Sequence, residues 1–128
     1  MPRLDVNLRA MGPMFDGRAA RAAREYVDEV EFEVAKEALR MVQARLRRVL
    51  RNPTGYYQSR VRVDPAGSRH VVHDSGVVYG PWLEGTGSRN YPVTRFRGYA
   101  TFRRTQALIQ RQARQIAQRI FARYRGRF

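Results

Sequence analysis

Few residue types in this chain could carry catalysis or hold a metal ion. The sequence has no cysteine, which excludes disulfides, thiolate metal sites and cysteine nucleophiles. Its two histidines, His70 and His73, would point to opposite faces of a strand, so we expect surface or partner-bonded histidines and no shared metal. His73, Asp74 and Ser75 are adjacent, and adjacent residues cannot place the base, acid and nucleophile of a hydrolase within mutual reach. We therefore expect no catalytic residue, no metal site and no enzymatic activity.

A glycine-rich stretch, Gly85-Thr86-Gly87-Ser88, has a composition that could hold a phosphate group through backbone amides. It lacks the Gly-Lys-Ser/Thr ending of a P-loop and the glycine spacing of a dinucleotide-binding loop. We interpret it as a structural turn, and we expect no bound cofactor.

The charge of the chain is strongly unbalanced. The formal net charge is +14, arginine supplies 24 of the 25 basic residues, and the sequence after Glu84 contains 11 arginines and no acidic residue. Such a surface attracts polyanions, which include nucleic acid, acidic protein faces and anionic lipid. The codon bias of a GC-rich genome would produce the same composition, and both explanations stay open.

Arginines and aromatic residues alternate between residues 89 and 104. This pattern can clamp phosphates and stack bases, although Tyr99 and Phe102 fit equally well in the core at the start of a helix. No zinc finger, RNA-binding strand motif or helix-turn-helix is recognisable, so sequence-specific reading is not expected. The candidate polyanion contacts are Arg89, Arg95, Arg97, Arg103, Arg104 and Arg111.

The most distinctive stretch, from Val78 to Gly87, contains the only tryptophan, the last acidic residue, three glycines and one proline. Pro81 has no amide donor, and glycines adopt backbone angles that other residues avoid, so we expect neither an ordinary strand nor an ordinary helix. The composition indicates a specialised turn or a docking surface. The eight residues called the motif segment below are Tyr79, Gly80, Pro81, Trp82, Leu83, Glu84, Gly85 and Thr86.

The sequence pattern predicts an α+β fold in a single domain, residues 1–128. A domain of this length can bury one modest core. The sheet is expected to be small and antiparallel, with about three to four strands. In its β region we expect strands at Tyr57–Val63, Arg69–His73 and Val77–Tyr79. The expected order is an N-terminal arm or strand (1–15), a long helix (18–51), a β-meander (57–79), the motif and a loop (80–98), and a basic helix (100–124).

Both predicted helices are expected to pack against a further element or subunit. The first has one apolar stripe and would be about 50 Å long, which exceeds the diameter of a compact monomer, so we expect part of it to pack on another subunit. The second has a polar face of arginine and glutamine without acid, and we expect it to lie against the acidic stretch Glu25–Glu37. No apolar run is long enough to span a bilayer and no signal peptide is recognisable, so we expect a soluble protein without a membrane partner.

The motif segment resembles a signature of the head–tail joining (tail-completion, or neck) proteins of long-tailed double-stranded DNA phages. That signature is a tyrosine, a small residue, a proline, an aromatic residue, an aliphatic residue, a glutamate and a glycine–threonine pair. Here one residue is missing between Glu84 and the Gly85–Thr86 pair. Downstream, Tyr99-Ala100-Thr101-Phe102-Arg103-Arg104 stands where the family has a phenylalanine–leucine–arginine–proline–alanine type of sequence, and it has no proline. The order of the predicted elements is similar to that of the family.

The resemblance implies a structural subunit of the virion neck or tail, assembled in the host cytoplasm. It implies a homo-oligomeric ring, six- or twelve-fold, whose partners are adjacent neck, portal-adaptor or tail-tube proteins, with DNA in its lumen. Tyr79 and Trp82 would anchor the loop or a subunit contact, and Glu84 would pair with an arginine of its own chain or of a neighbour. The alternatives are that Trp82 is buried in the monomer and that Glu84 caps a turn. The alternative function is a basic DNA-binding or packaging accessory protein without sequence specificity.

Overall fold

The computed structural model describes residues 2–6, 17–50, 55–66 and 69–127, and within these ranges it leaves out the side chains of residues 17–20. The predicted arm 1–15 and the end of the predicted helix 18–51 therefore lie partly outside the described residues. The elements are β1 (Arg3–Val6), α1 (Gly17–Val49), α2 (Tyr56–Arg60), β2 (Arg62–Ala66), β3 (Arg69–His73), α3 (Gly80–Glu84), α4 (Thr101–Tyr124) and a 3₁₀ turn (Arg125–Arg127). The predicted α+β class is confirmed.

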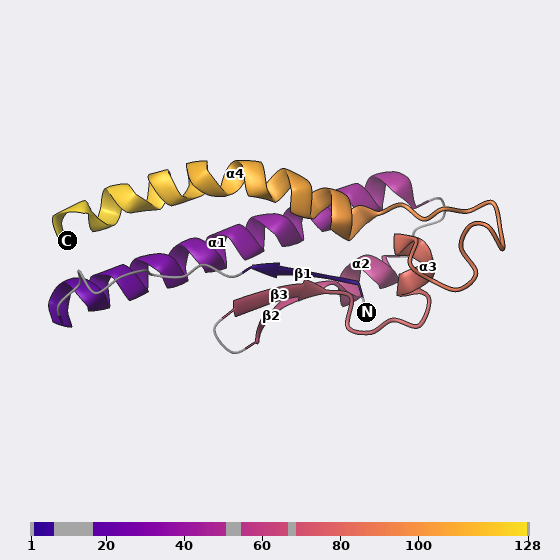
Figure 1. The fold of residues 1–128 in the computed structure, drawn as a ribbon, viewed down its shortest axis with the longest axis horizontal. Coiled ribbons are helices and arrows are strands. Elements are labelled where there is room, and N and C mark those ends of the chain that lie inside the picture. Colours follow the sequence, from indigo (N-terminus) through magenta and orange to yellow (C-terminus); the bar gives the residue numbers. More distant parts are fainter. Residues whose placement is uncertain (1, 7–16, 51–54, 67–68, 128) are drawn as a thin grey trace.

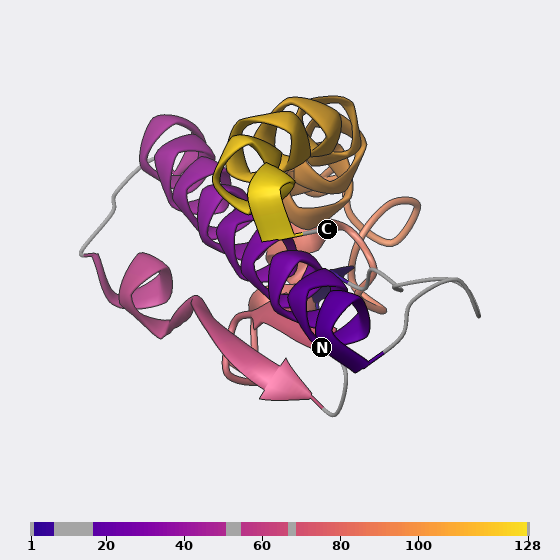
Figure 2. The same cartoon turned by 90° about the vertical axis from the view of Figure 1, so that its left-hand side faces the viewer.

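The two long helices run antiparallel along the length of the molecule, and both lie on one side of the sheet (Figures 1 and 2). The three strands are antiparallel in the order β1-β3-β2. Leu4, Val72 and Val63 stand in register on these strands, and their side chains share the face that the helices cover. Alternate positions on the other face carry ion pairs such as Arg3–Asp5 and Arg62–Asp64.

The apolar stripe of α1 forms the centre of the core, because valine, alanine and leucine recur on one side of a helix without internal glycine or proline. Val30, Val34, Val42 and Leu46 are buried against the sheet and against α4. From the other helix, apolar residues at three- and four-residue steps complete this core. They include Phe102, Ile109, Ile116 and Ile120.

The overhanging half of α1 finds its neighbour within the same chain. The 33 residues of α1 extend well past the sheet, and the C-terminal half of α4 lies alongside them (Figure 1). The hydroxyl of Tyr26 donates to the carbonyl of Ala117 at 2.8 Å, and its ring contacts Phe121 and Tyr124 edge-on. The length of α1 therefore does not by itself require a second subunit.

The expected pairing of acidic and basic helix halves is confirmed. Arg123 Nη2 lies 2.6 Å from Glu29 Oε1, and the hydroxyl of Tyr124 donates to the second oxygen of the same carboxylate at 2.6 Å. Arg127 Nη2 lies 2.6 Å from Glu25 Oε2. The acidic stretch of α1 that begins at Glu25 thus pairs with arginines at the C-terminal end of the chain.

Two predicted strands are wrong. Tyr56–Arg60 forms the helical turn α2, and β2 begins only at Arg62, because Tyr57 turns inward to reach a buried carboxylate described below. Residues Val77–Tyr79 form turns, with left-handed backbone at Ser75 and Gly76 before them. The third strand of the sheet is β1, which lies within the segment 1–15 that was expected to form an N-terminal arm or strand.

Candidate functional site

The motif segment contains a short helix, α3, so the expectation that it could not be helical is wrong. Pro81 stands in the first turn of α3, where a helix needs no amide donor. Gly85 ends the helix with left-handed backbone, φ 105°, and its amide donates to the carbonyl of Pro81 at 2.9 Å. The amide of Thr86 donates to the same carbonyl at 2.9 Å. Pro81 and Gly85 are compatible with a helix because they stand at the beginning and at the end of α3.

A buried carboxylate fixes the start of α3. Asp74 is fully buried, Oδ2 accepts a hydrogen bond from the Tyr57 hydroxyl at 2.9 Å, and Oδ1 accepts one from the Gly76 amide at 3.0 Å. A Cβ atom on Gly80 would lie 1.9 Å from Asp74 Oδ2, so only glycine fits there. Burial, reinforced by the neighbouring Asp74 carboxylate, raises the pKa of Tyr57 strongly. The motif glycine thus lets α3 close onto the end of β3.

Glu84 caps the N-terminus of α4. Its Oε1 accepts a hydrogen bond from the Phe102 amide at 2.9 Å, and its Oε2 accepts one from the Arg103 amide at 3.0 Å. The residue at the usual capping position, Ala100, has left-handed backbone with φ 51° and makes no side-chain cap. A carboxylate from a distant helix therefore takes over the role of the missing cap and suits the positive end of the helix dipole. The sequence suggested an arginine pair or the cap of a turn for Glu84, and the described contacts show a cap of the helix α4.

Two glycines let the chain cross itself behind α3. A Cβ on Gly85 would lie 2.2 Å from the Arg97 carbonyl oxygen, and a Cβ on Gly98 would lie 2.2 Å from Gly85 Cα. At this crossing the Tyr99 amide donates to the Leu83 carbonyl at 2.7 Å. This crossing holds the end of the long loop beside α3 and places the first residues of α4 next to the Glu84 carboxylate.

Asn90 organises the loop that follows α3. It is buried, its Oδ1 accepts from the Gly87 amide at 2.7 Å, and its Nδ2 donates to the Trp82 carbonyl at 2.9 Å. The Gly87 amide is therefore occupied, and Thr86 is turned back toward Pro81. These contacts fit the interpretation of this glycine-rich stretch as a structural turn.

The outer surface of the motif segment is aromatic. The rings of Trp82 and Phe96 have centroids 4.2 Å apart, and Phe96 meets Tyr99 edge-on at 5.1 Å. With Val49 from the end of α1, these residues line an open pocket of about 570 Å³, called the aromatic pocket below. Trp82 keeps 38% of its surface exposed, so it is not a core residue.

Exposed apolar side chains are frequent in the stretch of sequence around α3. Among the described residues nine large hydrophobic side chains are exposed, and five of them belong to the turn before α3, to α3 or to the loop after it. The most exposed is Val78, at 95%. The five are Val78, Tyr79, Trp82, Tyr91 and Val93. Exposed apolar side chains on a rigidly held segment are typical of a protein-binding surface.

The six arginines predicted to contact polyanions divide between two places. Arg104 and Arg111 lie on α4 in a cleft facing α1, and Arg103 is exposed on the first turn of α4. Arg89 and Arg95 are exposed on the loop, where the guanidinium of Arg97 lies 3.8 Å from the centre of the Tyr91 ring.

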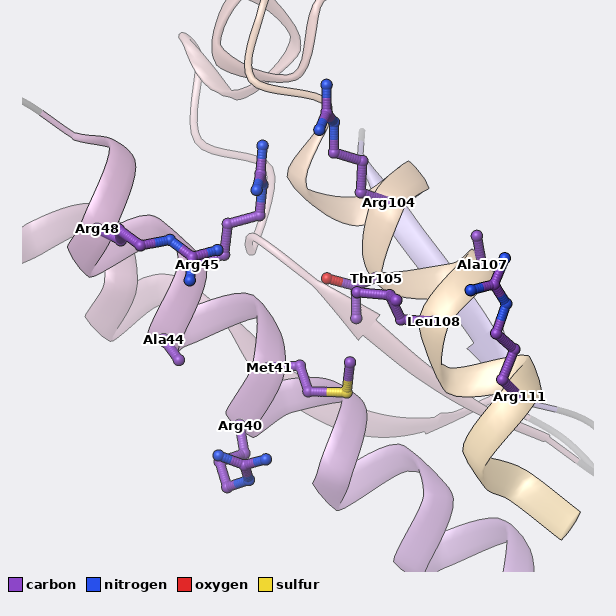
Figure 3. A pocket seen from close by; sticks show the side chains of 10 residues that line it. All are labelled: Arg40, Met41, Ala44, Arg45, Arg48, Arg104, Thr105, Ala107, Leu108 and Arg111. Carbon is purple, nitrogen blue, oxygen red and sulfur yellow. The ribbon is translucent and has the colours of Figure 1, made fainter. Parts of the chain in front are cut away.

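The cleft between α1 and α4 has an arginine rim, and it is called the arginine cleft below (Figure 3). It has a volume of about 440 Å³, and Met41, Thr105 and Leu108 point into it between the helices. Met41, Thr105 and Leu108 are called its floor below, and its arginines are called its rim. The remaining lining residues are Arg40, Arg45, Arg48, Arg104, Arg111, Ala44 and Ala107.

Sequence reasoning missed Arg45 and Arg48 as site residues. The signal was present, because the acidic residues of α1 lie between Glu25 and Glu37 and are followed only by basic ones, while α4 carries no acidic residue. Antiparallel packing pairs the end of α4 with the acidic half of α1 and leaves the start of α4 against its basic half. Burial and the adjacent Arg104 and Arg48 lower the pKa of Arg45, whose Nε is buried without a hydrogen-bond partner among the described residues.

The two histidines lie apart and have carboxylate partners. His70 Nδ1 lies 2.6 Å from Glu31 Oε1, and His73 Nε2 lies 2.6 Å from Asp64 Oδ2. The Ser75 hydroxyl donates to the Arg60 carbonyl and not to His73. Within the described ranges no three or more histidine, cysteine, aspartate or glutamate side chains are placed to hold a metal ion, and no helix there could cross a membrane.

Comparisons with protein-family models, with curated proteins and with solved structures found no match to this chain. Functional assignment therefore depends on the motif segment, the aromatic pocket and the arginine cleft.

Proposed function

We propose that this chain is a structural, non-enzymatic subunit of a phage neck, forming a ring that joins the head to the tail or completes the tail. Its partners would be further copies of itself and adjacent neck, portal-adaptor or tail-tube proteins, in a virion assembled in the host cytoplasm. The resemblance of the motif segment supports this proposal, and the geometry of that segment supplies its physical basis.

The observation that carries the proposal is the exposed aromatic surface on a rigidly held α3. Asp74, Glu84 and Asn90 use their polar groups to fix the backbone around α3, while Tyr79 and Trp82 remain at the surface. Aromatic side chains that are already ordered bury a large area on binding and lose little conformational freedom. The polar groups around α3 thus hold its backbone in place, and the exposed apolar side chains remain available for contact.

The assembly mechanism would be surface complementarity between unlike faces of neighbouring copies. The aromatic surface lies at the end of the molecule that holds the C-terminus of α1 and the start of α4 (Figure 1). A face at one end that meets a different face on the next copy makes a heterologous contact, and such contacts close into rings when the rotation allows.

The direct test is electron microscopy of particles made without this protein. DNA-filled heads beside separate tails of normal length would support a joining role, and tails of aberrant length would support tail completion. Intact, infectious particles would contradict the neck assignment.

A second test compares two matched aromatic substitutions in the purified protein. Tyr79 and Phe32 are both 45% exposed, but only Tyr79 belongs to the motif segment. Tyr79→Ser should weaken self-association at least about tenfold, because truncating a central interface aromatic costs about 2 kcal/mol, whereas Phe32→Ser should leave it unchanged. Mass photometry over a concentration series measures this, and equal association of both variants and the parent would count against the aromatic face.

The alternative function, DNA binding without sequence specificity, is favoured by the exposed Arg89 and Arg95 beside the Arg97–Tyr91 stack. A phosphate binder loses duplex affinity steeply with salt, with a slope of about −0.9 per neutralised phosphate. A neck subunit should show weak duplex binding together with ordered oligomers. Steep salt dependence without oligomers would therefore select this alternative.

A further inference from the structure

The arginine cleft holds more positive charge than the described chain neutralises. Of its five rim arginines only Arg40 has an ion-pair partner among the described residues, and that partner is Glu37 on the same helix. Arg45 donates to the Tyr99 carbonyl at 3.2 Å, and its buried Nε has no partner there. Arg48 and Arg104 are exposed on opposite sides of the cleft.

Several acidic residues of the described chain are already engaged elsewhere. Glu84 gives both carboxylate oxygens to the amides at the start of α4. Glu25 and Glu29 pair with arginines at the far end of the helix pair, and Glu33 pairs with Lys36. A second copy of the chain carries the same net charge of +14, which repels a surface of this kind, so we take the missing negative charge to come from a different molecule.

The floor of the cleft decides what kind of anion fits. Met41 and Leu108 on this floor are apolar, and Leu108 is 47% exposed although it points between the helices. A phosphate backbone gains nothing from an apolar floor. A peptide with acidic side chains along its edges and an apolar side chain at its centre satisfies both the rim and the floor. A cleft of about 440 Å³ can accept such a side chain.

We propose that the arginine cleft binds an acidic amphipathic segment of a partner protein, with its carboxylates on Arg48, Arg104 and Arg111 and an apolar side chain between Met41 and Leu108. The aromatic pocket continues this surface, because Val49 follows Arg48 and the carbonyl of Tyr99 accepts a hydrogen bond from Arg45. That the partner is a neck protein rests on the proposed function, whereas binding of the segment itself does not.

The test uses the purified full chain and a labelled synthetic helical peptide of about 16 residues, with leucine on one face and glutamate on the others. Fluorescence anisotropy measures binding of this peptide and, separately, of a duplex of about 20 base pairs. The combined variant Arg48→Glu/Arg104→Glu changes the cleft. The control Arg21→Glu/Arg24→Glu makes the same charge change at exposed positions near the other end of α1.

We expect the cleft variant to weaken peptide binding at least about tenfold and the control to weaken it less than about threefold. Leu108→Gln keeps every charge and should weaken peptide binding about fivefold while leaving duplex binding unchanged. Circular dichroism checks that each variant is folded, and Leu108→Gln tests the cleft independently should the double reversal unfold the chain.

Three outcomes would overturn the proposal. Absence of peptide binding to the parent chain would show that the cleft takes no acidic segment. Equal loss in the cleft variant and the control would show attraction by net charge alone. Tighter binding of the duplex than of the peptide, insensitive to Leu108→Gln, would make the cleft a nucleic-acid site. The electron-microscopy test can fail independently of all three, so the two proposals are separable.

Discussion

The cap that Glu84 provides to α4 makes a sharp quantitative test. Replacing this side chain by alanine removes both acceptors from the amides of Phe102 and Arg103. Replacing it by glutamine keeps one oxygen as an acceptor but places an amide group opposite the second donor. Because Ala100 makes no side-chain cap of its own, no other described side chain takes over this role.

The expected loss follows from the burial of this contact. Glu84 is only 7% exposed, so water cannot readily replace the carboxylate. Hydrogen bonds to a charged group contribute about 1.5–3 kcal/mol each, and the charge itself adds up to about 1 kcal/mol at the end of a helix. Glu84→Ala should therefore lower the free energy of unfolding by about 4 kcal/mol and Glu84→Gln by about 2 kcal/mol. A domain of this size has about 5–15 kcal/mol in total, so the alanine variant should be marginally stable.

Urea denaturation followed by far-ultraviolet circular dichroism measures these losses, and amide hydrogen exchange locates them. In both Glu84 variants the exchange rate should increase most at the amides of Phe102 and Arg103 and less in the rest of α4. The control is Glu33→Ala, which removes a largely exposed ion pair with Lys36 and should cost at most about 0.5 kcal/mol. A loss below about 1 kcal/mol in Glu84→Ala, or no change in amide exchange, would refute the assigned role of Glu84.

Two further substitutions test the support of α3. Gly85→Ala places a Cβ 2.2 Å from the Arg97 carbonyl oxygen at a φ of 105°, and it should lower the free energy of unfolding in urea by more than about 3 kcal/mol. The control Gly76→Ala has a φ of 72° and open space around the new Cβ, and it should cost only about 1 kcal/mol. Similar losses in the two variants would contradict the close contact between Gly85 and Arg97. Tyr57→Phe leaves the buried Asp74 short of a donor and should cost about 2 kcal/mol at neutral pH. Because folding raises the pKa of Tyr57 above its ordinary 10.0, its contribution is complete below that pH and lost as the pH rises further, so the variant should lose less stability than the parent in alkaline solution.

The large elements could be predicted because their own sequence periodicity determines them. Val30, Val34, Val42 and Leu46 recur at helical spacing without interruption, and their burial is the same whichever partner covers them. The short elements could not be predicted in this way. Tyr57 is apolar and aromatic enough to suggest a strand, and it lies in a helical turn because its hydroxyl must reach Asp74, 17 residues later.

The motif segment was recognisable as special, but the roles of its residues depend on contacts distant in sequence. Glu84 meets amides 18 and 19 residues later, and Gly80 is required by the position of Asp74 and not by its own neighbours. The arginine cleft depends on the antiparallel pairing of two helices, which no local pattern specifies. Once that pairing is known, the arginines in the second half of α1 fall opposite the arginines at the start of α4, and the cleft follows.

The separation of charge along the helix pair has a consequence for how this molecule approaches a partner. At one end Glu25 and Glu29 compensate the arginines of α4, while at the other end the arginine cleft is uncompensated within the described residues. An elongated body charged in this way has a large permanent dipole moment along its axis, and an anionic assembly exerts a torque on it at a distance. Toward an anionic partner such a molecule would turn before it collides, and the end with the cleft and the aromatic pocket would arrive first. Productive encounters become frequent at low ionic strength and rarer as salt screens the torque.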